Sequence, residues 1–134
     1  MNITTRQIRG KGRGKLIGYP TINLEISQVL QGSTLQDLQE GIWAAWVVIA
    51  GKKYQGALHF GPVPTFGESA KSLEVFLLDA SDDDLVGVEG EAIELIPIAR
   101  LRDIENFDTT EALTAQISRD VEDVRKLLSD TTIG

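Results

Sequence analysis

The sequence predicts a mostly β domain, a small closed or nearly closed barrel of about half a dozen antiparallel strands, followed by one amphipathic helix. Short apolar segments alternate with polar residues at period two over the first hundred residues, turn-forming residues separate them, and helical spacing begins near residue 109. The chain has 134 residues, 42% of them hydrophobic, which is enough for one core and too few for two comfortable domains. We therefore expect one domain over residues 1–134, with the barrel over about 1–100 and the helix over about 109–129.

The predicted strands follow one another along the barrel region. Their expected ranges are residues 3–9, 22–26, 42–49, 54–60, 73–79 and 91–99. Aromatic and β-branched residues are dense in the third of these ranges, as is typical of strands. Ala50 and Gly51 are predicted to form a hairpin turn, whereas residues 29–40 are polar and turn-rich, which favours a loop or a short helix.

The C-terminal segment has the pattern of a helix with one apolar side. That stripe consists of Leu113, Ile117, Val121, Val124 and Leu128. Asp108 or Thr109 can cap the start of the helix. An apolar stripe must be buried against another surface, so we expect this helix to cover part of the barrel.

Composition narrows the class of protein. Twenty acidic and thirteen basic residues give a formal charge of −7, which disfavours nucleic acid as the main partner and, with few aromatic residues, disfavours an oligonucleotide-binding barrel. The absence of cysteine excludes disulfides and thiolate metal sites. The first residues do not resemble a signal peptide, and no apolar run approaches membrane-spanning length. We expect a soluble, cytoplasmic monomer that acts on small molecules, with no nucleic-acid or membrane partner.

A glycine-rich basic segment near the N-terminus is the first candidate site. Gly10, Gly12 and Gly14 allow the backbone to approach an anion closely, and Lys15 adds positive charge. Thr21 and Asn23 then lie on one side of an extended segment and offer two hard oxygen ligands that suit Mg²⁺. These residues together predict a polyphosphate site mounted on strands. A glycine-rich turn with cations, taken alone, is more often a solvated hairpin.

Glu74 is the second candidate. Period-two alternation places it opposite Leu73 and Val75 and on the same face as Phe76. The carboxylate is then either on a solvated surface or partly buried in a pocket, where loss of water raises the pKa of a carboxyl and makes a better base near neutral pH. Spacing alone favours an exposed structural glutamate.

Three other features are given structural interpretations. His59 is the only histidine, so it cannot belong to a multi-histidine metal centre, and we expect it to pack or to form a hydrogen bond. Residues 82–84 are three aspartates that we interpret as a solvated turn. Trp43 and Trp46 fall on opposite faces of one strand.

An ordered set of motifs over nearly the whole chain resembles riboflavin kinase. The motifs are Arg9-Gly-x-Gly-Arg-Gly14, Gly18-Tyr-Pro-Thr-x-Asn23, Gly41-Ile-Trp43, Gly61-x-x-Pro-Thr-Phe66, Leu73-Glu-Val-x-Leu-Leu-Asp79, Leu101-Arg102, Phe107 and Leu113-x-x-Gln-Ile-x-x-Asp120. The resemblance implies a six-stranded antiparallel Greek-key barrel with a C-terminal helix. It also implies transfer of the γ-phosphoryl group of ATP to the ribityl 5′-hydroxyl of riboflavin, which gives FMN and ADP. Both the stand-alone kinases and the kinase half of bifunctional enzymes share this pattern.

The resemblance also implies a role for each matching residue. Glu74 would be the catalytic base, and Thr21 and Asn23 would ligate Mg²⁺. The implied nucleotide-binding residues are Gly10, Gly12, Gly14, Lys15, Thr21, Asn23, Leu77, Asp79 and Val86. The implied flavin-binding residues are Arg102, Glu105 and Phe107.

Several positions depart from the family pattern. Phe76 stands where the family usually has histidine, Val86 where it has tyrosine, and His59 where it has asparagine. The family's Leu-Arg-x-Glu becomes Leu-Arg-Asp-Ile104, with Glu105 displaced by one residue. These departures motivate an alternative, a non-catalytic flavin- or nucleotide-binding regulatory module that keeps the barrel and lacks kinase activity.

Overall fold

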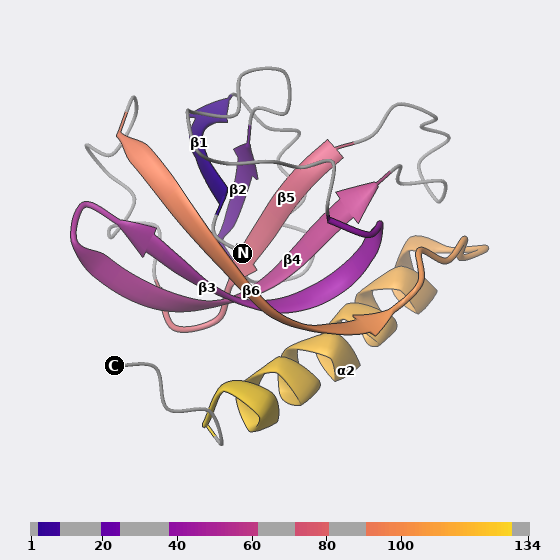
Figure 1. Ribbon diagram of the computed structural model, residues 1–134. Coiled ribbons are helices and arrows are strands. Elements are labelled where there is room, and N and C mark those ends of the chain that lie inside the picture. The colour runs from indigo at the N-terminus through magenta and orange to yellow at the C-terminus, as the bar shows by residue number, and fades with distance from the viewer. Residues whose placement is uncertain (1–2, 9–19, 25–37, 62–71, 81–90, 130–134) are drawn as a thin grey trace.

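The structure, a computed structural model, describes residues 3–8, 20–24, 38–61, 72–80 and 91–129 (Figure 1). Its elements are β1 (Ile3–Ile8), β2 (Thr21–Leu24), β3 (Gly41–Ile49), β4 (Lys52–Gly61), β5 (Ser72–Leu77), β6 (Ala92–Arg102) and α2 (Thr110–Ser129). Each predicted strand and the predicted helix correspond to one of these elements. The main difference in extent is β6, which continues to Arg102 and so carries the barrel slightly beyond residue 100.

The six strands close into an antiparallel barrel in the order β1-β2-β5-β4-β3-β6. The order departs from the sequence order because β2 pairs with β5, and β6 returns to lie between β3 and β1. Closure leaves no strand of the described sheet with an unpaired edge, which protects it from edge-to-edge association. The expectation of a small closed antiparallel barrel is confirmed.

The barrel interior is filled by inward-facing residues of every strand. Leu58, Val75 and Leu95, for example, are completely buried there. Gly56 also faces inward, and a Cβ atom on it would lie 2.6 Å from Cγ2 of Val75 and 2.9 Å from Cγ2 of Val47. Glycine at this position is what allows both valines to fill the barrel.

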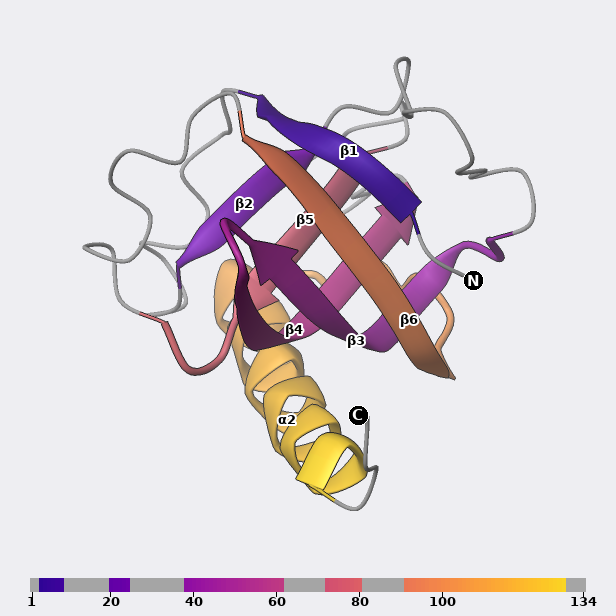
Figure 2. The same ribbon diagram turned by 60° about the vertical axis from the view of Figure 1, so that its left-hand side comes forward.

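Helix α2 packs against the outside of the barrel, where it buries a second apolar cluster (Figure 2). The strand residues beneath it include Ala44 and Ala57, whose small side chains let the helix approach the sheet closely. Ile117, Val121 and Val124 of the predicted stripe are all buried. The helix therefore covers the barrel as its sequence predicts.

The helix start and the predicted hairpin turn are also confirmed. The hydroxyl Oγ1 of Thr109 accepts a hydrogen bond of 3.1 Å from the amide of Ala112, so Thr109 caps α2. Ala50 and Gly51 form the turn between β3 and β4, both with positive φ, 50° and 83°. That pair of angles is characteristic of the type I′ hairpin.

The two tryptophans of β3 lie on opposite faces, as their parity predicts. Trp43 packs against the interior cluster and Trp46 against the cluster beneath α2. No helix in the described part of the chain combines the length and apolar character needed to cross a bilayer.

Candidate active site on the outer face of the barrel

The strand registers align the candidate residues in one row on the outer face of the barrel. Asn23 of β2 pairs with Glu74 of β5, which pairs with His59 of β4. His59 pairs with Ile42 of β3, and Ile42 pairs with Arg102 of β6. Residues far apart in the sequence therefore form a continuous line across five strands, from the proposed magnesium ligands to the proposed flavin site.

The two proposed metal ligands lie beside the proposed base. Thr21 and Asn23 are both half-buried on the outer face of β2, and Asn23 is the direct cross-strand neighbour of Glu74. Directly opposed side chains in an antiparallel pair have Cβ atoms about 5 Å apart. The backbone pairing extends past Thr21, because the amide of Leu77 donates a 2.9 Å hydrogen bond to the carbonyl of Pro20. The two proposed oxygen ligands and the carboxylate of Glu74 therefore lie next to one another on the outer side of β2 and β5.

Glu74 is buried, with 2% of its surface exposed. The expectation from spacing alone, an exposed structural glutamate, is therefore wrong, because the side chain is buried. The predicted alternation holds, since Leu73 and Val75 face the barrel interior while Phe76 belongs to the cluster beneath α2. The outer face of β5 is covered at this point, which period-two spacing could not reveal.

His59 adjoins Glu74 from the other side. Its ring nitrogen Nε2 lies 3.1 Å from the carbonyl oxygen of Gly61, a geometry in which the ring donates the hydrogen bond. The expectation of a hydrogen-bonding histidine is confirmed. Among the described residues, no three histidine, aspartate or glutamate side chains gather into a metal-binding cluster.

The flavin-side residues surround the end of β6. The guanidinium of Arg102 donates two hydrogen bonds to the carboxylate of Asp120, from Nε at 2.9 Å and from one Nη atom at 2.7 Å. Its other Nη atom donates a 3.0 Å hydrogen bond to the carbonyl of Asp103. The Arg102 guanidinium lies 5.9 Å from the centroid of the Phe107 ring. The structure therefore brings Arg102 and Phe107 together, while Glu105, between them in the sequence, is exposed.

The remaining residues that were predicted to bind the nucleotide do not belong to the outer-face row. The carboxylate of Asp79 accepts a 3.1 Å hydrogen bond from the amide of Gln55 and so ties the end of β5 to β4. The side chain of Leu77 is completely buried in the barrel interior, and its backbone amide is the one that donates to the carbonyl of Pro20. Gly10, Gly12, Gly14, Lys15 and Val86 lie outside the described residues.

Asp120 is a functional candidate to which sequence reasoning assigns no role. It is 3% exposed, on the same side of α2 as Ile117, Val121 and Val124. The signal was present, because an acidic residue within the apolar stripe of a helix needs a buried partner. That partner, Arg102, comes from a strand and could not be identified from helical spacing.

The chain matches the family model described as flavokinase, riboflavin kinase, over residues 1–128. Human riboflavin kinase is 30% identical over 123 residues, a match that covers 90% of this chain and 76% of the human protein. The RNA-binding riboflavin kinase RibR of Bacillus subtilis is 30% identical over 120 residues, which cover 89% of this chain and 47% of RibR. This chain thus spans only about half of that bacterial relative.

Two solved structures share the fold. A crystal structure described as a macrolide-efflux protein from Streptococcus pneumoniae superposes with a TM-score of 0.73 at 27% identity, over 92% of this chain and 38% of that one. Riboflavin kinase from Trypanosoma brucei superposes with a TM-score of 0.60 at 20% identity, over 96% of this chain and 79% of that one. The family match over nearly the whole chain, together with the barrel and its C-terminal helix, shows that this chain belongs to the riboflavin kinase family.

Proposed function

We propose that this protein is a riboflavin kinase that transfers the γ-phosphoryl group of ATP to the ribityl 5′-hydroxyl of riboflavin, giving FMN and ADP. The observation that carries the proposal is the single outer-face row from Asn23 through Glu74 to Arg102. It joins oxygen ligands, a buried carboxylate and a guanidinium next to an aromatic ring. Family membership supports the same reaction.

Thr21 and Asn23 are the residues that would hold Mg²⁺. A hydroxyl and an amide oxygen are hard ligands, and both are half-buried beside Glu74 on one face of β2. Magnesium commonly takes few protein ligands and completes its shell with water and substrate phosphates, so two such groups suit it. The bound ion would neutralise charge on the phosphates during transfer.

Glu74 is the proposed general base. As the 5′-oxygen of riboflavin attacks the γ-phosphorus, its proton passes to the carboxylate of Glu74. The new bond joins that oxygen to phosphorus, the bond between phosphorus and the β,γ-bridging oxygen breaks, and ADP leaves with the electron pair. Phosphoryl transfer depends mostly on positioning and charge neutralisation, so one base beside a metal site is a sufficient set of groups.

Arg102 and Phe107 are the proposed flavin contacts. Glu74 and Arg102 are three strand spacings apart along the row, which corresponds to roughly 14 Å along the curved sheet. That separation suits a substrate whose reactive hydroxyl sits at one end of a chain and whose planar ring system sits at the other. Glu105, which is exposed in the same segment, is a further proposed contact.

Phe76 is the observation that favours the alternative, a non-catalytic flavin- or nucleotide-binding module. This residue pairs with Thr21 and is 8% exposed in the cluster beneath α2, so an apolar side chain stands next to a proposed metal ligand. The alternative predicts that riboflavin or FMN binds and that no phosphoryl group is transferred. The buried carboxylate beside Thr21 and Asn23 leads us to place the kinase first.

The direct test is incubation of the protein with riboflavin and Mg-ATP, followed by chromatographic separation of the flavins. We expect FMN to form with ATP, and formation to stop when EDTA removes the metal. Titration calorimetry with riboflavin and FMN, run on the same preparation, separates the two functions. Flavin binding without FMN at high protein concentration would establish the non-catalytic module instead. Absence of nucleic-acid binding, expected from the −7 charge, stays a prediction, since a relative is described as RNA-binding.

A further inference from the structure

Asp120 and Arg102 form an ion pair between the helix and the last strand. The contact is bidentate, with donor–acceptor distances of 2.9 and 2.7 Å. The side chain of Asp120 is 4% exposed and that of Arg102 is 15% exposed. Paired parallel hydrogen bonds of this kind fix the plane of a guanidinium as well as its position. Arg102 is thereby held in one orientation at the end of β6.

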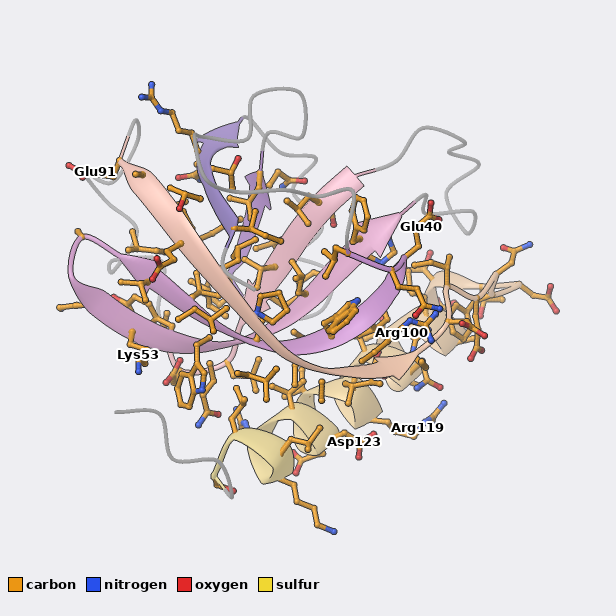
Figure 3. The ribbon with its side chains drawn as sticks, in the orientation of Figure 1. Glu40, Lys53, Glu91, Arg100, Arg119 and Asp123 are labelled. Carbon is orange, nitrogen blue, oxygen red and sulfur yellow. The ribbon has the colours of Figure 1, made fainter. Side chains whose placement is uncertain are left out.

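A second set of contacts holds Asp120 itself. The side-chain amide of Gln116, one helical turn earlier, donates a 3.1 Å hydrogen bond to Oδ1 of Asp120. Arg119 in turn donates a 2.8 Å hydrogen bond to the amide oxygen of Gln116. Figure 3 shows Arg119 extending from α2 away from the barrel. The carboxylate is therefore supported from the solvent side of the helix and cannot rotate freely.

Contacts with the described residues use only part of the donor capacity of the Arg102 guanidinium. Arginine carries five N–H groups, and the bonds of Arg102 with described residues use three of them, two to Asp120 and one to the carbonyl of Asp103. The partly exposed guanidinium and the Phe107 ring lie 5.9 Å apart, from guanidinium carbon to ring centroid. A planar, carbonyl-bearing ring could contact the aromatic face and accept from the remaining N–H groups.

We infer that Asp120 is a positioning residue for the flavin, which it does not touch, and that it acts by orienting Arg102 next to Phe107. The inference rests on the proposed flavin-binding role of Arg102 and deepens that proposal. A fixed guanidinium loses little conformational entropy when the flavin binds, whereas a free one must be ordered at that moment. Asp120 is 18 residues from its partner in sequence and lies on the helix, so α2 takes part in forming the substrate site as well as in covering the barrel.

The test is the substitution Asp120→Asn, with Asp123→Asn as the matched control. Asp123 is an exposed aspartate on the same helix, three residues further on (Figure 3). We expect Asp120→Asn to raise the riboflavin Kd, measured by quenching of flavin fluorescence, about tenfold, the loss expected for a misdirected charge-assisted contact. The KM for ATP should stay within about twofold of wild type, and Asp123→Asn should change neither value. An unchanged riboflavin Kd, or an equal rise in both constants, would overturn the inference.

Two further variants separate positioning from mere support of the fold. In the exchanged pair Arg102→Asp with Asp120→Arg, the two charges still face each other, but the guanidinium projects from the helix. We expect its riboflavin Kd to remain at least about tenfold above wild type, and recovery to the wild-type value would show a structural role alone. Gln116→Ala removes one bond to Asp120 without leaving a buried charge unpaired, so it tests the inference even if Asp120→Asn fails to fold. It should raise the riboflavin Kd by about two- to threefold, and no change would count against the inference.

Measurements of riboflavin binding and of FMN formation distinguish failure of the kinase proposal from failure of the inference about Asp120. If the wild-type protein binds riboflavin in an Asp120-dependent manner but forms no FMN, the kinase proposal fails and the inference about Asp120 stands. If FMN forms and Asp120→Asn leaves the riboflavin Kd and KM unchanged, the kinase proposal stands and the inference fails. A wild-type protein that binds no riboflavin would refute both.

Discussion

Replacing Gly56 with alanine would place a methyl group inside a filled barrel. The added carbon would lie 2.6 Å from Cγ2 of Val75 and 2.9 Å from Cγ2 of Val47, both closer than carbon atoms approach without displacement. Val75 is completely buried, and its branched side chain has no flexible end that could move aside. Overpacking of this kind costs about 2 kcal/mol. For 134 residues that corresponds to a fall in Tm of about 7 °C.

A double-mutant cycle with Val75→Ala tests the same contact more sharply. Val75→Ala alone removes two buried methyl groups and leaves a cavity, at a cost of about 2 kcal/mol. In the double variant the methyl group added by Gly56→Ala occupies the space that Cγ2 of Val75 leaves. The 2.9 Å contact with Cγ2 of Val47 remains, so we expect the pair to cost more than about 2 kcal/mol but clearly less than the additive value of about 4 kcal/mol.

Urea denaturation followed by tryptophan fluorescence measures all four proteins, because Trp43 and Trp46 report on the two faces of β3. Val75 lies between Glu74 and Phe76 in β5, so a displaced strand should also slow FMN formation by Gly56→Ala. Strict additivity of the two free energies would refute the argument that Gly56 is required by close packing against Val75.

For three further substitutions we predict the direction in which the stability of the fold changes. Ala50→Asn should raise the free energy of unfolding by roughly 0.5–1 kcal/mol in urea denaturation, because Ala50 has φ 50° in a type I′ turn that favours asparagine; an unchanged or lower value would contradict the assigned turn. Thr109→Ala removes the cap on the amide of Ala112 and should lower Tm by about 4 °C, from a loss of about 1 kcal/mol; an unchanged Tm would argue against the cap. Gly41→Ala should be the most damaging of the three, since the backbone has φ +149° and a Cβ would lie 2.6 Å from the carbonyl oxygen of Arg102. We expect a loss above about 2 kcal/mol and weaker riboflavin binding, and normal binding would contradict the close approach of β3 to the end of β6.

The period of the apolar residues explains why much of the fold was predictable. Alternation in β3 placed Trp43 and Trp46 correctly on opposite faces, and the helical stripe of Ile117, Val121 and Val124 identified the buried side of α2. Both are local properties of one element. The pairing of β2 with β5 is different, because it joins strands separated by about fifty residues, and no local pattern of either strand specifies its partner.

Burial of the site residues could not be predicted from the same signals. Period-two spacing places Glu74 on the face opposite Leu73 and Val75, but it does not say whether that face is covered, so spacing favours an exposed glutamate, which is wrong. Asp120 shows the same limit, because its partner Arg102 belongs to another element. Cross-strand register and helix placement decide which polar residues become desolvated, and both are tertiary properties.

The measurement that tests the central claim most directly is the turnover of Glu74→Gln beside that of Glu94→Gln. Glu94 is a half-buried glutamate of β6 that pairs with Thr4 and Val48, outside the row of site residues. We predict that Glu74→Gln lowers kcat for FMN formation by roughly 10²-fold or more, with ATP and riboflavin still bound, whereas Glu94→Gln retains wild-type kcat. An undiminished kcat in Glu74→Gln would contradict the account, because the buried carboxylate beside Asn23 would then not be the base.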